Sequence, residues 1–170
     1  MVREERHMTT WQRGSSEAVR SLITGIRDTR WSWQETDVEE LCRRMGWVLL
    51  EAIDGKGAFA DAGLGVPGDE IRMLAGDGHI NDISIQITQL VSDSGADRDR
   101  FIRDTFADAV DAGLAVLGEP TDRQHTEPPT VRWRLEDSTV LIRNLESAVT
   151  VTWASNRFQD DWDRIAEALE

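Results

Sequence analysis

The chain has 170 residues, of which 39% are hydrophobic and 30% are charged, a composition typical of one globular domain and not of a disordered chain. Its formal net charge of −13 argues against nucleic-acid binding, because contacts to a phosphate backbone need clustered Lys and Arg. No apolar run approaches the roughly 18 residues of a membrane span, so we expect no membrane association.

The N-terminal segment is charged and has no apolar stretch behind it, which argues against a signal peptide. We therefore expect a flexible leader over residues 1–14, within which Met8 could be the natural start, followed by a single domain over residues 15–170. The only cysteine, Cys42, cannot form an internal disulfide, which fits a reducing compartment. We expect the protein to be cytoplasmic.

The first part of the chain predicts two short helices, over residues 16–27 and 36–45, because apolar residues recur there at helical spacing. A strand is expected at 47–53. Residues 54–69 hold five glycines and a proline and predict a long flexible connection. Whether this connection contacts a partner is left open at this point.

The rest of the chain predicts two groups of strands separated by the longest helix. Strands are expected at 70–75 and 80–91, the helix at 98–117, and three further strands at 131–135, 139–143 and 148–153. A final helix begins near Asn156. Its apolar residues recur at i, i+4, i+7 and i+11 and predict a stripe that faces the core, namely Phe158, Trp162, Ile165 and Leu169.

These elements predict an α+β fold in the order α-α-βββ-α-βββ-α. The connections within each strand group are short and favour antiparallel pairing. We expect a single curved antiparallel sheet of about six strands, with the helices packed mainly on one face.

No group of residues has the spacing that catalysis, a metal or a cofactor requires. The three histidines are far apart, and Cys42 has neither a partner cysteine nor a base to activate it. The glycines around Lys56 fit neither the P-loop nor the dinucleotide pattern, and the aspartates near residue 97 fit helix capping better than a calcium loop. We therefore expect a non-enzymatic protein without a metal or cofactor.

Two acidic stripes are the candidate binding residues. Asp104, Asp108 and Asp111 share one face of the long helix, and Asp163 and Glu167 share a face of the last helix. Like charges at this spacing destabilise a helix by about 0.2–0.5 kcal/mol per pair, which solubility alone does not require. A solvated helix face is the simpler explanation. The functional interpretation is a surface that steers a basic protein partner.

Two alternatives use the polar face of the sheet. Arg132, Arg134 and Arg143 fall on the polar phase of their strands and could converge on a small anionic ligand, which would make this a ligand-binding or enzymatic domain. The uncovered sheet face could instead join two copies of the chain into a homodimer.

A resemblance to known proteins adds to this interpretation. It is carried by the segments Trp31-Ser32-Trp33, Met45-Gly46-Trp47 and Ala60-Asp61-Ala62-Gly63-Leu64-Gly65, together with Asp37 and Leu41. The chain resembles a family of small, uncharacterised actinobacterial proteins, which look like immunity proteins found beside secreted toxins. The element order is similar to that of type III secretion chaperones. The resemblance carries over no catalytic residue and implies that the protein sequesters a partner, either a basic toxin or a secreted substrate.

Overall fold

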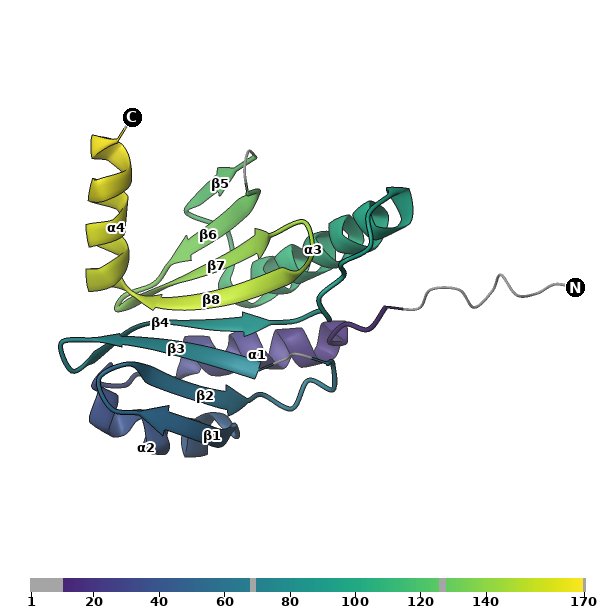
Figure 1. Ribbon diagram of the computed structural model, residues 1–170. Coiled ribbons are helices and arrows are strands. Elements are labelled where there is room, and N and C mark those ends of the chain that lie inside the picture. Colours follow the sequence, from purple (N-terminus) through teal and green to yellow (C-terminus); the bar gives the residue numbers. More distant parts are fainter. Residues whose placement is uncertain (1–10, 68–69, 126–127, 170) are drawn as a thin grey trace, which may run out of the picture.

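The computed structural model describes residues 11–67, 70–125 and 128–169. Within them the chain forms one eight-stranded antiparallel sheet and four α-helices (Figure 1). The helices are α1 (Ser16–Asp28), α2 (Val38–Met45), α3 (Ala96–Leu117) and α4 (Asn156–Ala168), with a short 3-10 helix, η2 (Glu35–Asp37), before α2. The strands are β1 (Val48–Ile53), β2 (Gly57–Asp61), β3 (Glu70–Gly76), β4 (His79–Gln86), β5 (Asp122–Gln124), β6 (Thr130–Arg134), β7 (Ser138–Asn144) and β8 (Val149–Ser155).

The sheet consists of two four-stranded meanders that meet at their last strands. The strand order is β1-β2-β3-β4-β8-β7-β6-β5, so β4 and β8 pair at the centre. The observed element order is therefore α-α-ββββ-α-ββββ-α. The α+β class and the antiparallel pairing are as predicted, but the prediction of about six strands is wrong. β2 and β5 are the two strands that the sequence pattern does not reveal.

Small residues explain why β2 resembles a loop in the sequence. It occupies part of residues 54–69, which we expected to be a flexible connection. Ala58 and Ala60 are buried there and leave little room for larger side chains. At Gly57 an added Cβ would lie 1.9 Å from the carbonyl oxygen of Met73, so only glycine allows β3 to pair at this point.

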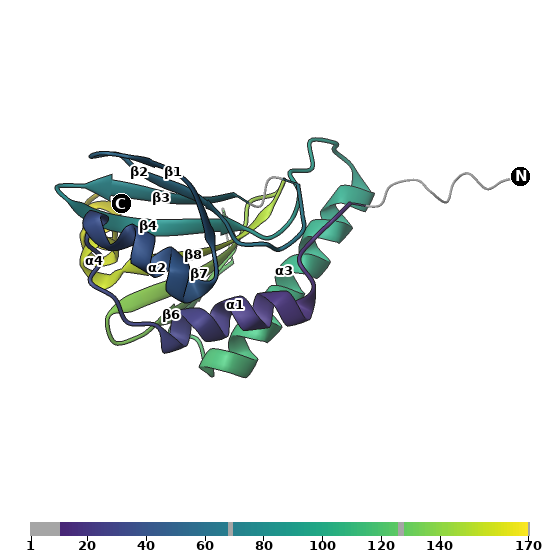
Figure 2. The same ribbon diagram turned by 90° about the horizontal axis from the view of Figure 1, so that it is seen from below.

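Helices α1, α2 and α3 cover one face of the sheet and enclose the core. Figure 2 shows α1 and α3 crossing each other on this face, where they are in contact. β3 and β6 contribute alternate residues to this core, and the central strands contribute Ile83, Val151 and Trp153, all fully buried. In β6 the buried residues are Val131 and Trp133, whereas β8 is buried along nearly its whole length. α4 lies outside this helix layer.

The segment before α1 is attached to α3. Residues 1–10 of the expected leader lie outside the described residues. From residue 11 onward the chain makes specific contacts: the ring of Trp11 lies 5.4 Å from that of Phe101, and Arg13 forms an ion pair with Asp108 at 2.7 Å. In the described part of the chain, no helix combines the length and the apolar composition that crossing a bilayer requires.

Candidate partner-binding site

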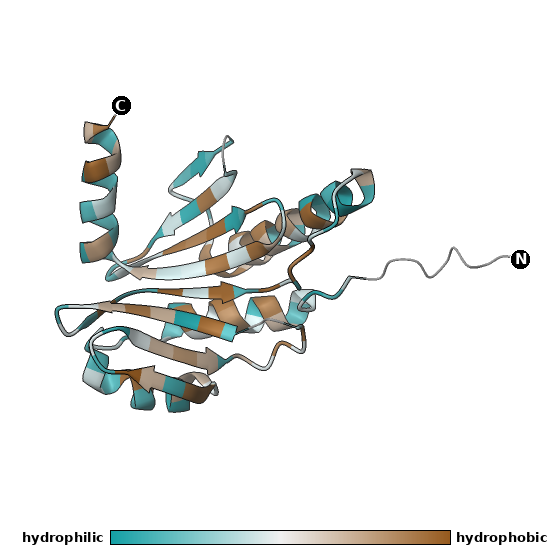
Figure 3. Ribbon diagram, viewed as in Figure 1, coloured by the Kyte–Doolittle hydropathy of each residue, from teal (hydrophilic) through white to brown (hydrophobic). Residues whose placement is uncertain are grey.

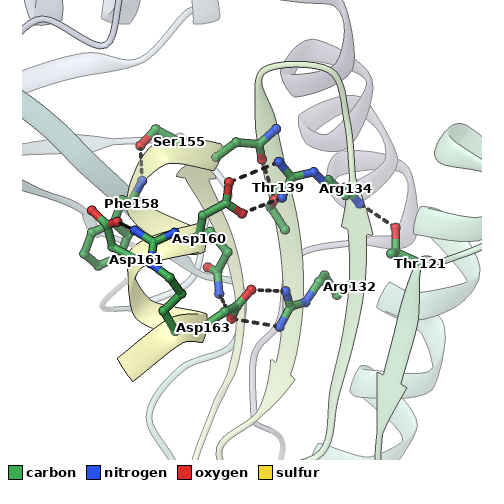
Figure 4. A network of polar contacts seen from close by, with 12 residues as sticks. Thr121, Arg132, Arg134, Thr139, Ser155, Phe158, Asp160, Asp161 and Asp163 are labelled. Carbon is green, nitrogen blue, oxygen red and sulfur yellow. Dashed lines mark hydrogen bonds and ion pairs between the residues drawn. The ribbon is translucent and has the colours of Figure 1, made fainter. Parts of the chain in front are cut away.

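Helix α4 stands on the sheet face opposite to the other three helices and is held there by its polar side. Arg132 and Arg134 project from β6 on this face, because the alternate residues Val131 and Trp133 point into the core. Arg132 donates to both carboxylate oxygens of Asp163, at 2.7 and 3.3 Å (Figure 4).

A second bidentate pair lies one turn earlier along α4. Arg134 donates to both oxygens of Asp160, again at 2.7 and 3.3 Å. Both pairs have the planar fork geometry in which a guanidinium binds a carboxylate most strongly. Together they fix the rotation of α4 about its axis.

The base of α4 is anchored by a buried amide. Asn156 donates from Nδ2 to the carbonyl oxygens of Leu135 and Glu136, each at 3.2 Å, and its Oδ1 accepts from the Thr139 hydroxyl at 2.6 Å. The Ser155 side chain caps the helix by accepting from the Phe158 amide. The polar groups of this anchor therefore satisfy one another.

The ion pairs perturb the acids of α4. Burial raises the pKa of Asp163, but hydrogen bonds from Arg132 and Gln159 outweigh it, so that this pKa lies below its usual value. The hydrogen bond from Arg134 lowers the pKa of Asp160. Both carboxylates are consequently ionised at neutral pH, and both pairs are formed there.

With its polar side against the sheet, α4 exposes its apolar side. Trp162 is 55% exposed, Ile165 53% and Leu169 82%. This contradicts our prediction that the stripe faces the core. Figure 3 shows the hydrophobic positions recurring along α4, away from the helix layer. We name Phe158, Trp162, Ile165 and Leu169 the α4 stripe. Phe158, at the base, is partly buried.

The two predicted acidic stripes do not form one surface. α3 belongs to the helix layer, whereas α4 lies on the opposite sheet face. Asp108 is paired with Arg13 and Asp163 with Arg132, so both serve the fold. The other three predicted residues are exposed and form no ion pair with the residues that the structure describes, namely Asp104, Asp111 and Glu167.

The polar sheet face presents its arginines to protein carboxylates. Arg132 and Arg134 bind α4, as described above. The third, Arg143, lies between them and the sheet centre, where its guanidinium donates to the Thr152 hydroxyl at 3.3 Å. Burial lowers the pKa of Arg143, although the charge of Asp82 acts in the opposite direction. Burial likewise raises the pKa of Asp82, against the charge of Arg143.

No set of three or more His, Cys, Asp or Glu side chains in the described ranges is placed to bind a metal ion. Cys42 is buried, and its burial raises the pKa of the thiol.

The fold and this site define an α+β protein in which two antiparallel meanders share one sheet and a single helix displays apolar residues on the face opposite to the helix layer. Residues 17–155 match DUF6301, a family of unknown function, and the chain belongs to this family. The match ends at Ser155, immediately before α4. No curated protein and no solved structure matches the chain.

Proposed function

We propose that this protein is a non-enzymatic binding protein that holds a partner protein against the α4 stripe. The observation that carries the proposal is the orientation of α4. An amphipathic helix ordinarily turns its apolar side toward the protein. Here the side that faces the sheet carries the buried Asn156 and Gln159, while Trp162 and Ile165 are exposed. Contiguous exposed apolar residues with a polar border are typical of protein-protein interfaces.

The spacing of the α4 stripe fits a helix that docks in a groove of its partner. Anchors at i, i+4, i+7 and i+11 lie on one side of a helix and enter such a groove together. Tryptophan is enriched among the residues that dominate interface energetics, which makes Trp162 the principal anchor. The ion pairs to β6 hold the helix in place before binding, so little conformational entropy is lost on association.

Charge favours a basic partner. α4 carries four acidic residues against two arginines, and the whole chain has a net charge of −13. A groove with apolar walls and a basic rim complements both features. Sequestration of such a partner is the task of an immunity protein or a secretion chaperone, and either role is compatible with this surface.

The binding experiment compares matched surface variants. A photo-crosslinking residue at position 162 would capture the partner in the native host. Affinity for the purified partner is then measured with Trp162→Ser and Ile165→Ser, against Leu90→Ser as control, because Leu90 is 62% exposed and lies outside α4. We expect the α4 variants to weaken binding at least about tenfold and the control to have no effect. Equal affinities in all three variants would disprove the docking surface.

A separate variant tests the acidic stripe of α3. Asp104, Asp108 and Asp111 are changed together to Asn, and binding is measured at low salt. If α3 steers the partner, association slows; an unchanged rate means that only α4 is involved. Sedimentation of the wild-type chain tests the homodimer alternative. A dimer that Trp162→Ser abolishes would show that the α4 stripe binds a second copy of the chain and no basic partner.

The alternative of a small anionic ligand on the sheet face has less support. Two of its three arginines already bind the carboxylates of Asp160 and Asp163. An anion would have to compete with these carboxylates for both guanidinium groups.

A further inference from the structure

Three tryptophans gather near the base of α4 and line a small cavity, and one of them also lines a neighbouring pocket. The ring of Trp33 lies 5.1 Å from that of Trp31 and 5.3 Å from that of Trp153. All three line a cavity of about 50 Å³, which we name the inner cavity. Trp33 and Asp137 also line a second pocket of about 490 Å³, the outer pocket. Because they share these residues, the two pockets are neighbours.

Two of the residues that line the inner cavity carry a hydrogen-bond donor that has no acceptor among the described residues. Nε1 of Trp31 and Nε1 of Trp153 are buried and bond to no residue in the described part of the chain. By contrast, Nε1 of the buried Trp133 donates to the carbonyl oxygen of Gly118 at 2.9 Å. A buried donor without a partner is costly, and an acceptor placed beside it recovers that free energy. A volume of about 50 Å³ is enough for an oxygen atom.

The outer pocket suits a cation. Its charged lining comprises three carboxylates and one arginine, namely Asp77, Asp137, Asp161 and Arg157, apart from His79. Asp137 is paired with Arg30 and Asp161 with Arg164, so Asp77 is the carboxylate of this pocket that has no ion pair among the described residues. Trp33 supplies an aromatic wall, and a cation over an indole ring is attracted by its electrons. The main chain of Trp33 is held by a hydrogen bond from the Ile80 amide to its carbonyl oxygen at 2.8 Å, and its ring packs against Trp31 and Trp153.

We propose that these pockets together receive one basic residue of a polypeptide. Its backbone carbonyl accepts from the indole N–H groups of Trp31 and Trp153 in the inner cavity. Its side-chain cation lies in the outer pocket, against Asp77 and Asp161. A neutral carbonyl fits better than a carboxylate, because the acidic lining of the outer pocket repels a negative ligand.

The proposal rests on the proposed function in one respect. Phe158, the first residue of the α4 stripe, also lines the outer pocket. A partner segment that lies on the stripe can therefore insert a basic residue at the base of the same helix. The two pockets therefore predict that this partner carries a basic residue at that position.

The test uses a small probe and needs no partner protein. N-acetyl-arginine amide, which has both the carbonyl and the cation, is titrated into the full chain labelled with nitrogen-15. The indole N–H resonances of the seven tryptophans are followed, and Trp31→Phe assigns one of them. We expect the resonances of Trp31 and Trp153 to shift while that of Trp133 stays constant, since its donor is already bonded.

Charge is tested with a matched probe and a matched variant. N-acetyl-glutamate amide should bind at least about tenfold more weakly than the arginine probe, because it places a like charge in the acidic pocket. Asp77→Asn should weaken the arginine probe, and asparagine tolerates the positive φ of 54° at this position. Equal binding of the two probes, a shift of Trp133 together with the others, or no shift of Trp31 and Trp153 would each overturn the proposal. Loss of partner binding in the α4 variants with a silent probe would disprove this inference and leave the proposed function intact.

Discussion

The ion pair between Arg132 and Asp163 offers the sharpest measure of how α4 is held. The two side chains are 25% and 35% exposed, and their contact is bidentate. Exposed pairs contribute about 0.2–1 kcal/mol, and the fork geometry and partial burial place this pair at the upper end, about 1 kcal/mol. A double-mutant cycle with Arg132→Gln, Asp163→Asn and the double variant isolates that coupling from the loss of either side chain alone.

The assay combines urea unfolding with hydrogen exchange of the α4 amides. For a chain of this length, 1 kcal/mol corresponds to a shift of about 2–4 °C in Tm. We expect a coupling near 1 kcal/mol and faster exchange along α4 in each single variant. The pair formed by Arg134 and Asp160 is more exposed and should show a weaker coupling. A coupling within error of zero for Arg132 and Asp163, with unchanged exchange in α4, would refute the argument that this pair fixes the helix.

The same pair predicts how stability depends on pH. The pKa of Asp163 is lower in the folded chain than in the unfolded chain, so its contribution is complete above the unfolded value of about 4. It is lost as the pH falls through the folded pKa. Wild type should therefore lose more stability than Asp163→Asn between neutral pH and pH values below about 4, as measured by urea unfolding.

Three further predictions concern the core. In Gly113→Ala the new Cβ would lie 2.5 Å from Cη2 of Trp133, so thermal unfolding should show a loss of about 1–3 kcal/mol, less the gain in helix propensity. Thr139→Val leaves Oδ1 of the buried Asn156 without its donor, and urea unfolding should show a cost of about 1–3 kcal/mol. The Cys42 thiol should react with a disulfide reagent only after denaturant is added, because it is buried and its pKa is raised; rapid reaction in the native chain would contradict its burial.

Periodicity predicts the fold where the pattern is strong. α3 and the alternating strands β6 and β8 lie close to the expected positions, because long apolar patterns leave little freedom. β2 has no such pattern, because Gly57, Ala58 and Ala60 are small; at Gly57 the backbone of β3 leaves no room for a Cβ. β5 is a three-residue edge strand that is fully exposed, so no apolar alternation marks it.

Periodicity alone could not predict the candidate site. The pattern of α4 shows that the helix has an apolar side but does not say which side faces the protein. A signal for the correct orientation was present in the alternation of β6, which places Arg132 and Arg134 on the face that α1, α2 and α3 leave uncovered. The two acidic stripes were separated for the same reason: their helices lie on opposite faces of the sheet, and sheet topology cannot be derived from helix spacing.

The inverted orientation of α4 is itself the strongest indication of function. Turning the α4 stripe toward the sheet would bury Trp162 and Ile165 against a polar surface of Arg132 and Arg134, and the two guanidinium groups would lose their carboxylates. The polar side therefore fits this face better, and the apolar side remains exposed although burial would stabilise it by about 1.5–3 kcal/mol per large side chain. Large apolar residues at positions that the fold leaves exposed do not match their environment. Such mismatches between sequence and structure concentrate at functional positions. The partner that we propose for the α4 stripe would bury these side chains, which the fold itself leaves exposed.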